Sequence, residues 1–267
     1  KIGWSFSAHA KDIWTSPDWE IQEKLASDSS GATFGVTCTG FGAAHLKNMA
    51  QNPNRVDLLY HGLDLSRFPN PPDSRSNDSV FKMLSVGRLV EKKGFDKLIE
   101  ALSLLPQDLN WQWVHIGGGA LKDQMAEMAA SRGLSDRISW FGACDQPEVV
   151  KAMREADLFV LPSRVAQDGD RDGLPNVLME AASQKLPILS TPVSAIPEFI
   201  DTEVHGVLVE DSPSELASAM VRLHKDPALR QKFAEAAYAR LMSEFGVDAG
   251  IQQLLSRLKI LLAGANG

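Results

Sequence analysis

The chain has 267 residues, of which 44% are hydrophobic and 23% are charged, a composition typical of globular proteins with one large or two modest domains. Its net charge is −7 and its pI is about 5.4. Nucleic-acid binding is therefore not expected, because it needs a basic face that displaces counterions from phosphates. No run approaches the roughly 20 apolar residues of a membrane span, and no charged-then-apolar signal opens the chain, so a cytoplasmic location is expected.

The two cysteines, Cys38 and Cys144, stand far apart in the sequence and form neither a CxxC pair nor a zinc-ligand cluster. Both are expected to be reduced, buried thiols. The six histidines are equally scattered, so the sequence predicts no metal site.

The front of the chain alternates between strand and helix patterns. Strands are predicted at 2–6, 33–38 and 56–60, and helices at 17–27 and 42–50. This is about half of a doubly wound fold, so we expect 1–68 to be the later part of an N-terminal Rossmann-like domain whose front is missing or was removed. Residues 69–79 are rich in Pro, Asp, Ser and Asn without an apolar period, which predicts a linker.

The alternation restarts at residue 80. Strands are predicted at 81–86, 111–116, 137–141, 156–161, 187–190 and 206–209, with helices at 94–105, 121–132, 146–155, 176–183 and around 196. Strands separated by helices predict a parallel, doubly wound α/β sheet. Helices at 214–224 and 227–245 complete a domain over 80–245, and one more helix is predicted at 247–262, within a C-terminal segment 246–267.

An acidic pair, Asp172 and Glu180, brackets the start of a predicted helix. It follows the strand 156–161, at whose carboxyl end open α/β sheets bind ligands. Pro175 suits the first helical position, and the free N–H groups there would face an anion. The alternative is an ordinary helix start with a solvated glutamate.

A basic motif, Arg88 with Lys93, lies where the first strand of the larger domain turns into its first helix. Two cations beside a glycine turn suit a diphosphate, which Arg88 would bind with two hydrogen bonds and Lys93 as a point charge. A solvated helix start is the alternative, but cations at a helix N-terminus oppose its dipole, which favours an anionic ligand.

Glycines end the next two strands, at 117–119 and at Gly142. Bare backbone at Gly118 and Gly142 would let a ligand approach closely. Neither stretch is a GxGxxG motif, and tight turns between strand and helix explain them equally well.

The order of these motifs resembles that of retaining glycosyltransferases of family 4, which have the GT-B architecture of two Rossmann-like domains. The matching stretches are 87–90 with 93–95, 117–119, 141–142, 156–163, 172–181 and 197–198. Residues 7–13 and 60–64 are similar to the late N-terminal, acceptor-side domain of bacterial exopolysaccharide and colanic-acid-type members.

The resemblance implies transfer of a hexose-type sugar from a UDP- or GDP-sugar to a saccharide or lipid-linked acceptor, in polysaccharide biosynthesis. It implies retention of configuration by front-face attack, with no obligatory metal or other cofactor. Arg88 and Lys93 would hold the diphosphate, and Glu180 the ribose hydroxyls. The donor-side backbone would include Gly118 and Gly142, and also Gly173, Leu174, Pro175 and Asn176, which with Asp172 face the sugar.

His9 would lie across the cleft, near the transferred sugar and the acceptor, and completes a catalytic set with Asp172 and Glu180. A satisfied structural histidine is its alternative role. Two departures from the family stand out. Asp172 stands where the family usually has Glu, and Ser194-Ala195 where it often has glycines, which narrows backbone approach near the phosphates.

Two other functions remain open. The chain could bind nucleotide sugar without turnover, because its N-terminal domain is incomplete, or act as a GT-B sugar-nucleotide epimerase. A phosphorylase would need a pyridoxal-binding lysine in a distinctive context, which the sequence lacks. The terminal helix carries Leu254, Leu255, Leu258, Leu261 and Leu262 at helical spacing. These leucines predict core packing or, alternatively, peripheral docking on the inner membrane face.

Overall fold

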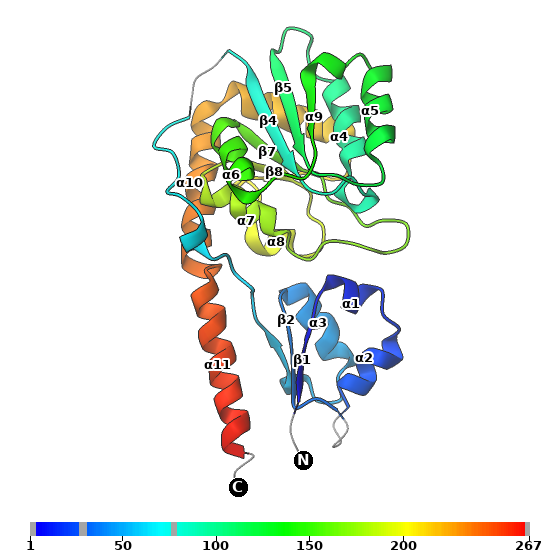
Figure 1. Cartoon of the computed structure of the whole chain (residues 1–267), viewed down its shortest axis with the longest axis vertical. Helices are drawn as coiled ribbons and strands as arrows, with labels where there is room; N and C mark the ends of the chain where they lie inside the picture. The colour runs from blue at the N-terminus through cyan, green and yellow to red at the C-terminus, as the bar shows by residue number, and fades with distance from the viewer. Residues whose placement is uncertain (1–3, 27–30, 76–78, 265–267) are drawn as a thin grey trace.

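The chain folds around two parallel β-sheets (Figure 1). The computed structural model describes residues 4–26, 31–75 and 79–264. The strands run in the order β1-β2-β3 in the smaller sheet and β6-β5-β4-β7-β8-β9 in the larger one. The parallel α/β class expected from the sequence is therefore confirmed.

The smaller sheet comprises β1 (Ser5–Ala8), β2 (Phe34–Thr37) and β3 (Val56–Leu58). The expected strand start at residue 2 lies outside the described residues. The helices are α1 (Ala10–Trp14), α2 (Asp18–Lys24) and α3 (Gly40–Met49). The register aligns Ala8 with Thr37 and Thr37 with Leu58, so the three strands end at one edge. The residues that follow them are thereby brought together.

The larger sheet is doubly wound. Its strands are β4 (Phe81–Val86), β5 (Trp111–Ile116), β6 (Ile138–Phe141), β7 (Leu158–Leu161), β8 (Ile188–Ser190) and β9 (Val207–Leu208). Between and after them come α4 (Phe95–Ser103), α5 (Lys122–Ser131), α6 (Gln146–Glu155), α7 (Asn176–Ser183), α8 (Ile196–Phe199), α9 (Pro213–Lys225) and α10 (Pro227–Glu244). The chain runs outward from β4 to β6 and returns to β7. The β4/β7 junction is therefore the switch point at which such sheets bind ligands.

Strand β7 lies in the middle of the larger sheet and is part of its core. All four residues of this strand are buried, because helices cover both faces of a parallel sheet. Two buried polar groups near it are paired: Ser85 Oγ donates to the Val160 carbonyl at 2.6 Å, and Trp113 Nε1 donates to Ser85 Oγ at 2.9 Å. The strand ends that carry the site are thus held rigidly.

The last helix, α11 (Val247–Gly264), returns to the smaller sheet and runs beside it (Figure 1). Leu254 packs against Phe34, Val36 and Leu59. Gln253 Nε2 donates to the Leu58 carbonyl at 3.0 Å, and Arg257 forms an ion pair with Asp57. The core-packing expectation is correct for Leu254, whereas Leu255 and Leu258 are exposed. The side chains of Leu261 and Leu262 lie outside the described part.

Candidate functional site

The basic and acidic motifs meet at the switch point. Lys93 Nζ lies 2.6 Å from Asp172 Oδ2, and Lys92 Nζ lies 3.6 Å from Asp172 Oδ1 and 3.1 Å from Asp170 Oδ1. The side chains of Lys93 and Asp172 are only 11% and 15% exposed. Two motifs about 80 residues apart in sequence therefore form one partly buried ionic cluster.

Gly94 determines where Lys93 sits. Its φ is +65°, and a Cβ built on it would lie 1.9 Å from the Pro162 carbonyl oxygen at the end of β7. Only glycine lets the backbone pass this close. The Arg164 N–H also donates to the Lys92 carbonyl at 2.8 Å. Together these contacts fix the basic turn against the loop that carries Asp172.

Unlike the ammonium group of Lys93, the guanidinium of Arg88 is not paired with a carboxylate among the described residues. Its side chain is exposed. Within the residues that the structure describes, its guanidinium has no ion pair or hydrogen bond. An anion could bind Arg88 without displacing a protein group, whereas at Lys93 it would have to compete with Asp172.

The glycines after β5 and β6 serve two purposes. Gly117 has a φ of +137°, and a Cβ there would lie 2.1 Å from the Gly87 carbonyl, so the tight-turn interpretation holds for this residue. Gly118 and Gly142 have open space around them. Beside Gly142, Phe141 is 52% exposed. It lines a pocket of about 300 Å³ between the sheet and α6.

Glu180 lies on α7, the helix that follows the loop carrying Asp170 and Asp172 (the acidic loop). Burial raises the pKa of its carboxyl, and the positive charge of Arg67 partly opposes that rise. Pro175 does not take the first helical position as predicted: it is the N-cap, and α7 begins at Asn176. Pro175 itself is buried, and the helix has the bounds 176–183 that were predicted.

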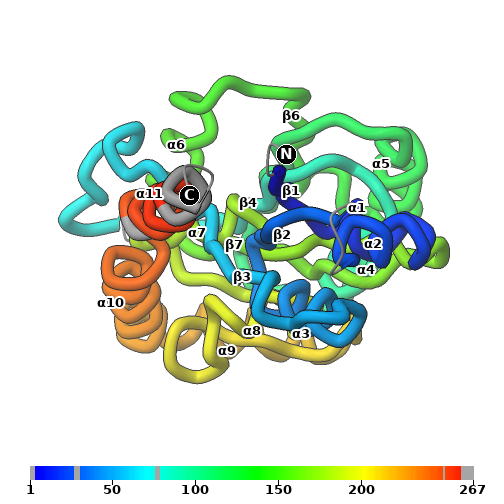
Figure 2. Tube along the Cα trace, turned by 90° about the horizontal axis from the view of Figure 1, so that it is seen from below, coloured from blue at the N-terminus to red at the C-terminus, as the bar shows by residue number. Residues whose placement is uncertain are grey.

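The acidic loop faces the smaller sheet. A Cβ at Gly173 would lie 3.4 Å from Thr39 Cγ2 and 3.7 Å from Ala10 Cβ. The Arg171 guanidinium stacks over the Trp14 ring at 5.0 Å. Figure 2 shows the molecule from the side of the smaller sheet, and in this view β2 and β3 lie in front of the region of β4 and β7. His9, next to Ala10 and exposed, is thus on the side of the smaller sheet that faces Asp172.

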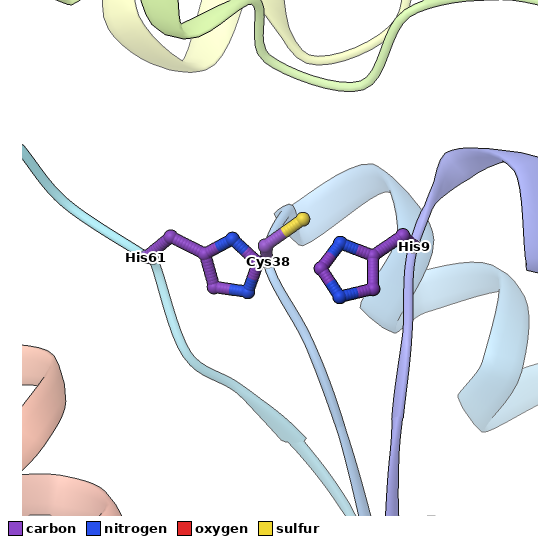
Figure 3. A group of neighbouring side chains, drawn as sticks. All are labelled: His9, Cys38 and His61. Atoms are coloured by element: carbon purple, nitrogen blue, oxygen red, sulfur yellow. The ribbon is translucent and has the colours of Figure 1, made fainter.

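One cluster was not predicted from the sequence. His9, Cys38 and His61 follow β1, β2 and β3, and one ligand atom of each lies within 4.8 Å of the others (Figure 3). Their wide sequence spacing hides this, because the strand register brings them together. Both cysteines are free, as expected, but Cys38 and Cys144 are half-buried rather than buried.

Glu198 on α8 links the two sheets. Its Oε2 accepts from the Gly40 N–H at 2.6 Å and from the Tyr60 hydroxyl at 2.9 Å, and its Oε1 accepts from the Phe41 N–H at 2.7 Å. The carboxylate therefore caps α3, where the helix dipole favours a negative charge. Burial and the neighbouring Glu198 raise the pKa of Tyr60.

Replacing Glu198 with alanine is expected to lower the free energy of unfolding by about 2–3 kcal/mol, because it removes charge-assisted hydrogen bonds at a helix N-terminus. Urea unfolding measures the loss. The control is Glu235→Ala, whose carboxylate pairs with Lys185 at 2.8 Å and is 50% exposed. That pair should contribute less than about 1 kcal/mol, and equal losses in both variants would contradict the capping role.

Ser194 occupies a glycine-like position. Its φ is +52°, and its hydroxyl is buried without a hydrogen-bond partner among the described residues. A left-handed non-glycine residue costs about 1–2 kcal/mol. The departure noted in the sequence is therefore accommodated with local strain.

Ser194→Gly is expected to stabilise the chain by about 1 kcal/mol, raising the melting temperature by roughly 2–4 °C. Differential scanning calorimetry measures the shift. Ser212→Gly is the control: Ser212 precedes α9 with a φ of −129°, so glycine relieves no strain there. An unchanged or lower melting temperature in Ser194→Gly would show that the strain is not relieved.

Residues 66–240 match the family glycosyl transferases group 1. The chain belongs to this family. It is 37% identical over 182 residues to the amylovoran biosynthesis glycosyltransferase AmsK of Erwinia amylovora, covering 67% of this chain and 45% of that protein. It is 30% identical over 221 residues to the putative colanic acid biosynthesis glycosyltransferase WcaL of Salmonella typhimurium, covering 82% and 54%.

Solved structures agree with the fold of this group 1 chain. TarM of S. aureus, in complex with UDP and saccharides, superposes with a TM-score of 0.80 at 17% identity, covering 94% of this chain and 50% of that one. HepE of Anabaena, in complex with UDP-glucose, gives 0.79 at 18% identity, covering 96% and 72%. These likenesses establish the GT-B fold. The chain spans about half the length of the curated relatives it matches.

Proposed function

We propose that this chain is, or is the donor-binding part of, a retaining glycosyltransferase. The substrate would be a UDP- or GDP-activated hexose and the acceptor a saccharide or lipid-linked saccharide, in exopolysaccharide biosynthesis. The observation that carries the proposal is the ionic cluster of Lys93 and Asp172 beside the exposed Arg88, at the switch point of the sheet. The family and the polysaccharide-related names of its relatives support it.

The proposed roles follow from charge. Breaking a sugar–phosphate bond leaves negative charge on the diphosphate, which Arg88 and Lys93 would stabilise as it develops. Positive character grows on the sugar carbon, where the Asp172 carboxylate would help. Glu180 would accept hydrogen bonds from the ribose hydroxyls. His9, on the opposite side, would contact the sugar or acceptor. No metal is assigned a role in this transfer.

The donor would extend along the strand ends. The diphosphate would lie at Arg88 and Lys93, and the base beside Gly118 and Gly142, where open space lets a ligand meet the backbone. The loop 173–176 would approach the sugar. For the base of the donor, we favour uracil, because the structures of HepE and TarM contain UDP-glucose and UDP. Guanine is the alternative.

Calorimetric titration with UDP, GDP and ADP tests the donor site. We expect selective binding of one nucleotide, weakened about 10- to 100-fold in Arg88→Ala, because a charged hydrogen bond contributes about 1.5–3 kcal/mol. Lys97→Ala is the matched control, since Lys97 is a partly exposed lysine that pairs with Glu100 within α4. Absence of binding to all three nucleotides, or equal weakening in both variants, would contradict the proposed site.

Turnover separates the competing functions. Transfer or hydrolysis of the donor, lost in Glu180→Ala, would support the enzyme. Binding without turnover would identify a nucleotide-sugar-binding module. Release of a 2-epimer with free nucleotide would instead identify an epimerase.

Peripheral membrane association is a further part of the proposal. None of the helices within the described residues is long and apolar enough to cross a bilayer. On α11, however, Ile251, Leu255 and Leu258 are exposed, and a lipid-linked acceptor would be presented at a membrane surface.

Flotation with anionic liposomes is expected to carry the chain upward, and Leu255→Glu with Leu258→Glu to abolish this. Leu104→Glu is the control, because Leu104 is 58% exposed but follows α4. If the wild-type chain does not float, the membrane proposal fails and the donor-site proposal is unaffected.

A further inference from the structure

The small sheet ends in three side chains that can bind a transition metal. His9 directly follows β1, Cys38 directly follows β2, and His61 lies three positions beyond β3. The register pairs Ala8 with Thr37, so the residues after them are neighbours across the strand ends. The Leu59 N–H donates to the Thr37 carbonyl at 2.8 Å and continues this alignment toward His61. The rigid parallel ladder therefore holds all three ligand groups.

The geometry is close to that of a metal site. The rings of His9 and His61 lie 4.7 Å apart between centroids, inclined at 50°. A nitrogen of His9 points toward the sulfur of Cys38 (Figure 3). All three ligand atoms lie within 4.8 Å of one another. Around a tetrahedral zinc ion they would be about 3.3–3.6 Å apart, so side-chain rotations that close the group by roughly 1 Å suffice.

A small cavity lies beside two of these side chains, and a neighbouring serine orients the ring of the third. Cys38 and His61, but not His9, line a cavity of about 20 Å³ whose other lining residues include Leu174 and Asn176. A space this small holds one water or one ion. Ser7 Oγ lies 3.4 Å from His9 Nε2, a contact that orients the imidazole ring.

We propose that His9, Cys38 and His61 form a binding site for one zinc-type divalent ion, with the fourth position open toward the acidic loop. Imidazole nitrogen and thiolate sulfur are both ligands that zinc binds, and three protein ligands leave a position for water or an exogenous ligand. The ion would not take part in sugar transfer, which is expected to proceed without metal. While bound, it would hold His9 at the edge of the sheet and away from the sugar.

The protonation states fit this donor set in part. Burial and the neighbouring His9 lower the pKa of His61, which favours the neutral form of its imidazole. Burial raises the pKa of the Cys38 thiol, so the ion has to displace that proton. That proton passes from the sulfur to solvent as the metal–sulfur bond forms.

Titration of the full chain with Co²⁺ tests the site directly, because a thiolate ligand produces a charge-transfer absorption band. We expect a band that saturates at one ion per chain and is displaced by Zn²⁺. Cys38→Ser should abolish the band. His61→Ala should weaken binding at least about tenfold, since even loss of a residue that hydrogen-bonds to a metal ligand costs that much. Cys144→Ser and His45→Ala are the matched controls. His45 lies on α3, beside the smaller sheet, but its ring packs against Trp14 and is not part of the cluster.

Alkylation by iodoacetamide gives a second readout that needs no variant and no activity. Zn²⁺ should slow the reaction of Cys38 at least about tenfold while leaving Cys144, the other half-buried free thiol, within about twofold. Absence of the Co²⁺ band, loss of the band in Cys144→Ser, or equal protection of both thiols would overturn the proposal. None of these outcomes depends on whether the chain transfers sugar.

Discussion

Gly94→Ala is expected to lower the free energy of unfolding by about 2–5 kcal/mol. Two costs add at this position. A left-handed φ of +65° costs an alanine about 1–2 kcal/mol. The new Cβ would also lie 1.9 Å from the Pro162 carbonyl oxygen, and moving backbone to relieve such overpacking costs about 1–3 kcal/mol. Urea unfolding of both proteins measures the difference.

Gly133→Ala separates the two costs. Gly133 has a φ of +69°, nearly the same as Gly94, but a Cβ there meets nothing within 4 Å. Its substitution should therefore cost only the conformational part, about 1–2 kcal/mol. Equal losses in the two variants would mean that the contact with Pro162 is not tight.

The same comparison reports on the site. Because Gly94 holds Lys93 against Asp172, Gly94→Ala should also weaken nucleoside diphosphate binding, measured by calorimetry under conditions where the variant is folded. Gly133 follows α5, away from the ionic cluster, so its variant should bind as the wild type does. Normal binding by Gly94→Ala would show that Lys93 does not depend on this turn.

Much of the larger domain could be predicted from its sequence. The bounds of β4, β5, α6 and α7 are those expected. Each of these elements has a regular spacing of apolar residues and is bordered by residues that typically begin or end a strand or helix. The placement of Lys93 and Asp172 at the carboxyl edge of one parallel sheet was also predicted, although their ion pair was not. By contrast, α1 was missed because five residues are too few to show a helical period.

Contacts that depend on register or on how the two sheets face each other could not be predicted. Pro197-Glu198 was recognised as part of the family pattern, but its capping of α3 requires α8 to meet the smaller sheet. The His9, Cys38 and His61 cluster depends on the alignment of three strands that are far apart in sequence. A single sequence carries no signal for such alignments.

Asp172→Asn is expected to affect binding and turnover in opposite directions. The carboxylate now pairs with Lys93 at 2.6 Å, so a diphosphate has to displace it. An asparagine removes that competing charge, a pair contributing about 1 kcal/mol, and should tighten nucleoside diphosphate binding roughly fivefold. Transfer from the sugar donor should nevertheless fall by roughly 100-fold or more, because the positive character on the sugar loses its carboxylate.

Asp170→Asn is the matched control for this prediction. Asp170 lies on the same loop and contacts Lys92 at 3.1 Å, with a more exposed side chain than Asp172. We expect its diphosphate affinity and its turnover to change by less than about threefold, as is usual for a partly exposed ion pair. Weaker diphosphate binding in Asp172→Asn would show instead that Asp172 positions Lys93 for the ligand. In that case the ion pair would be part of the assembled binding site rather than a competitor that the donor displaces.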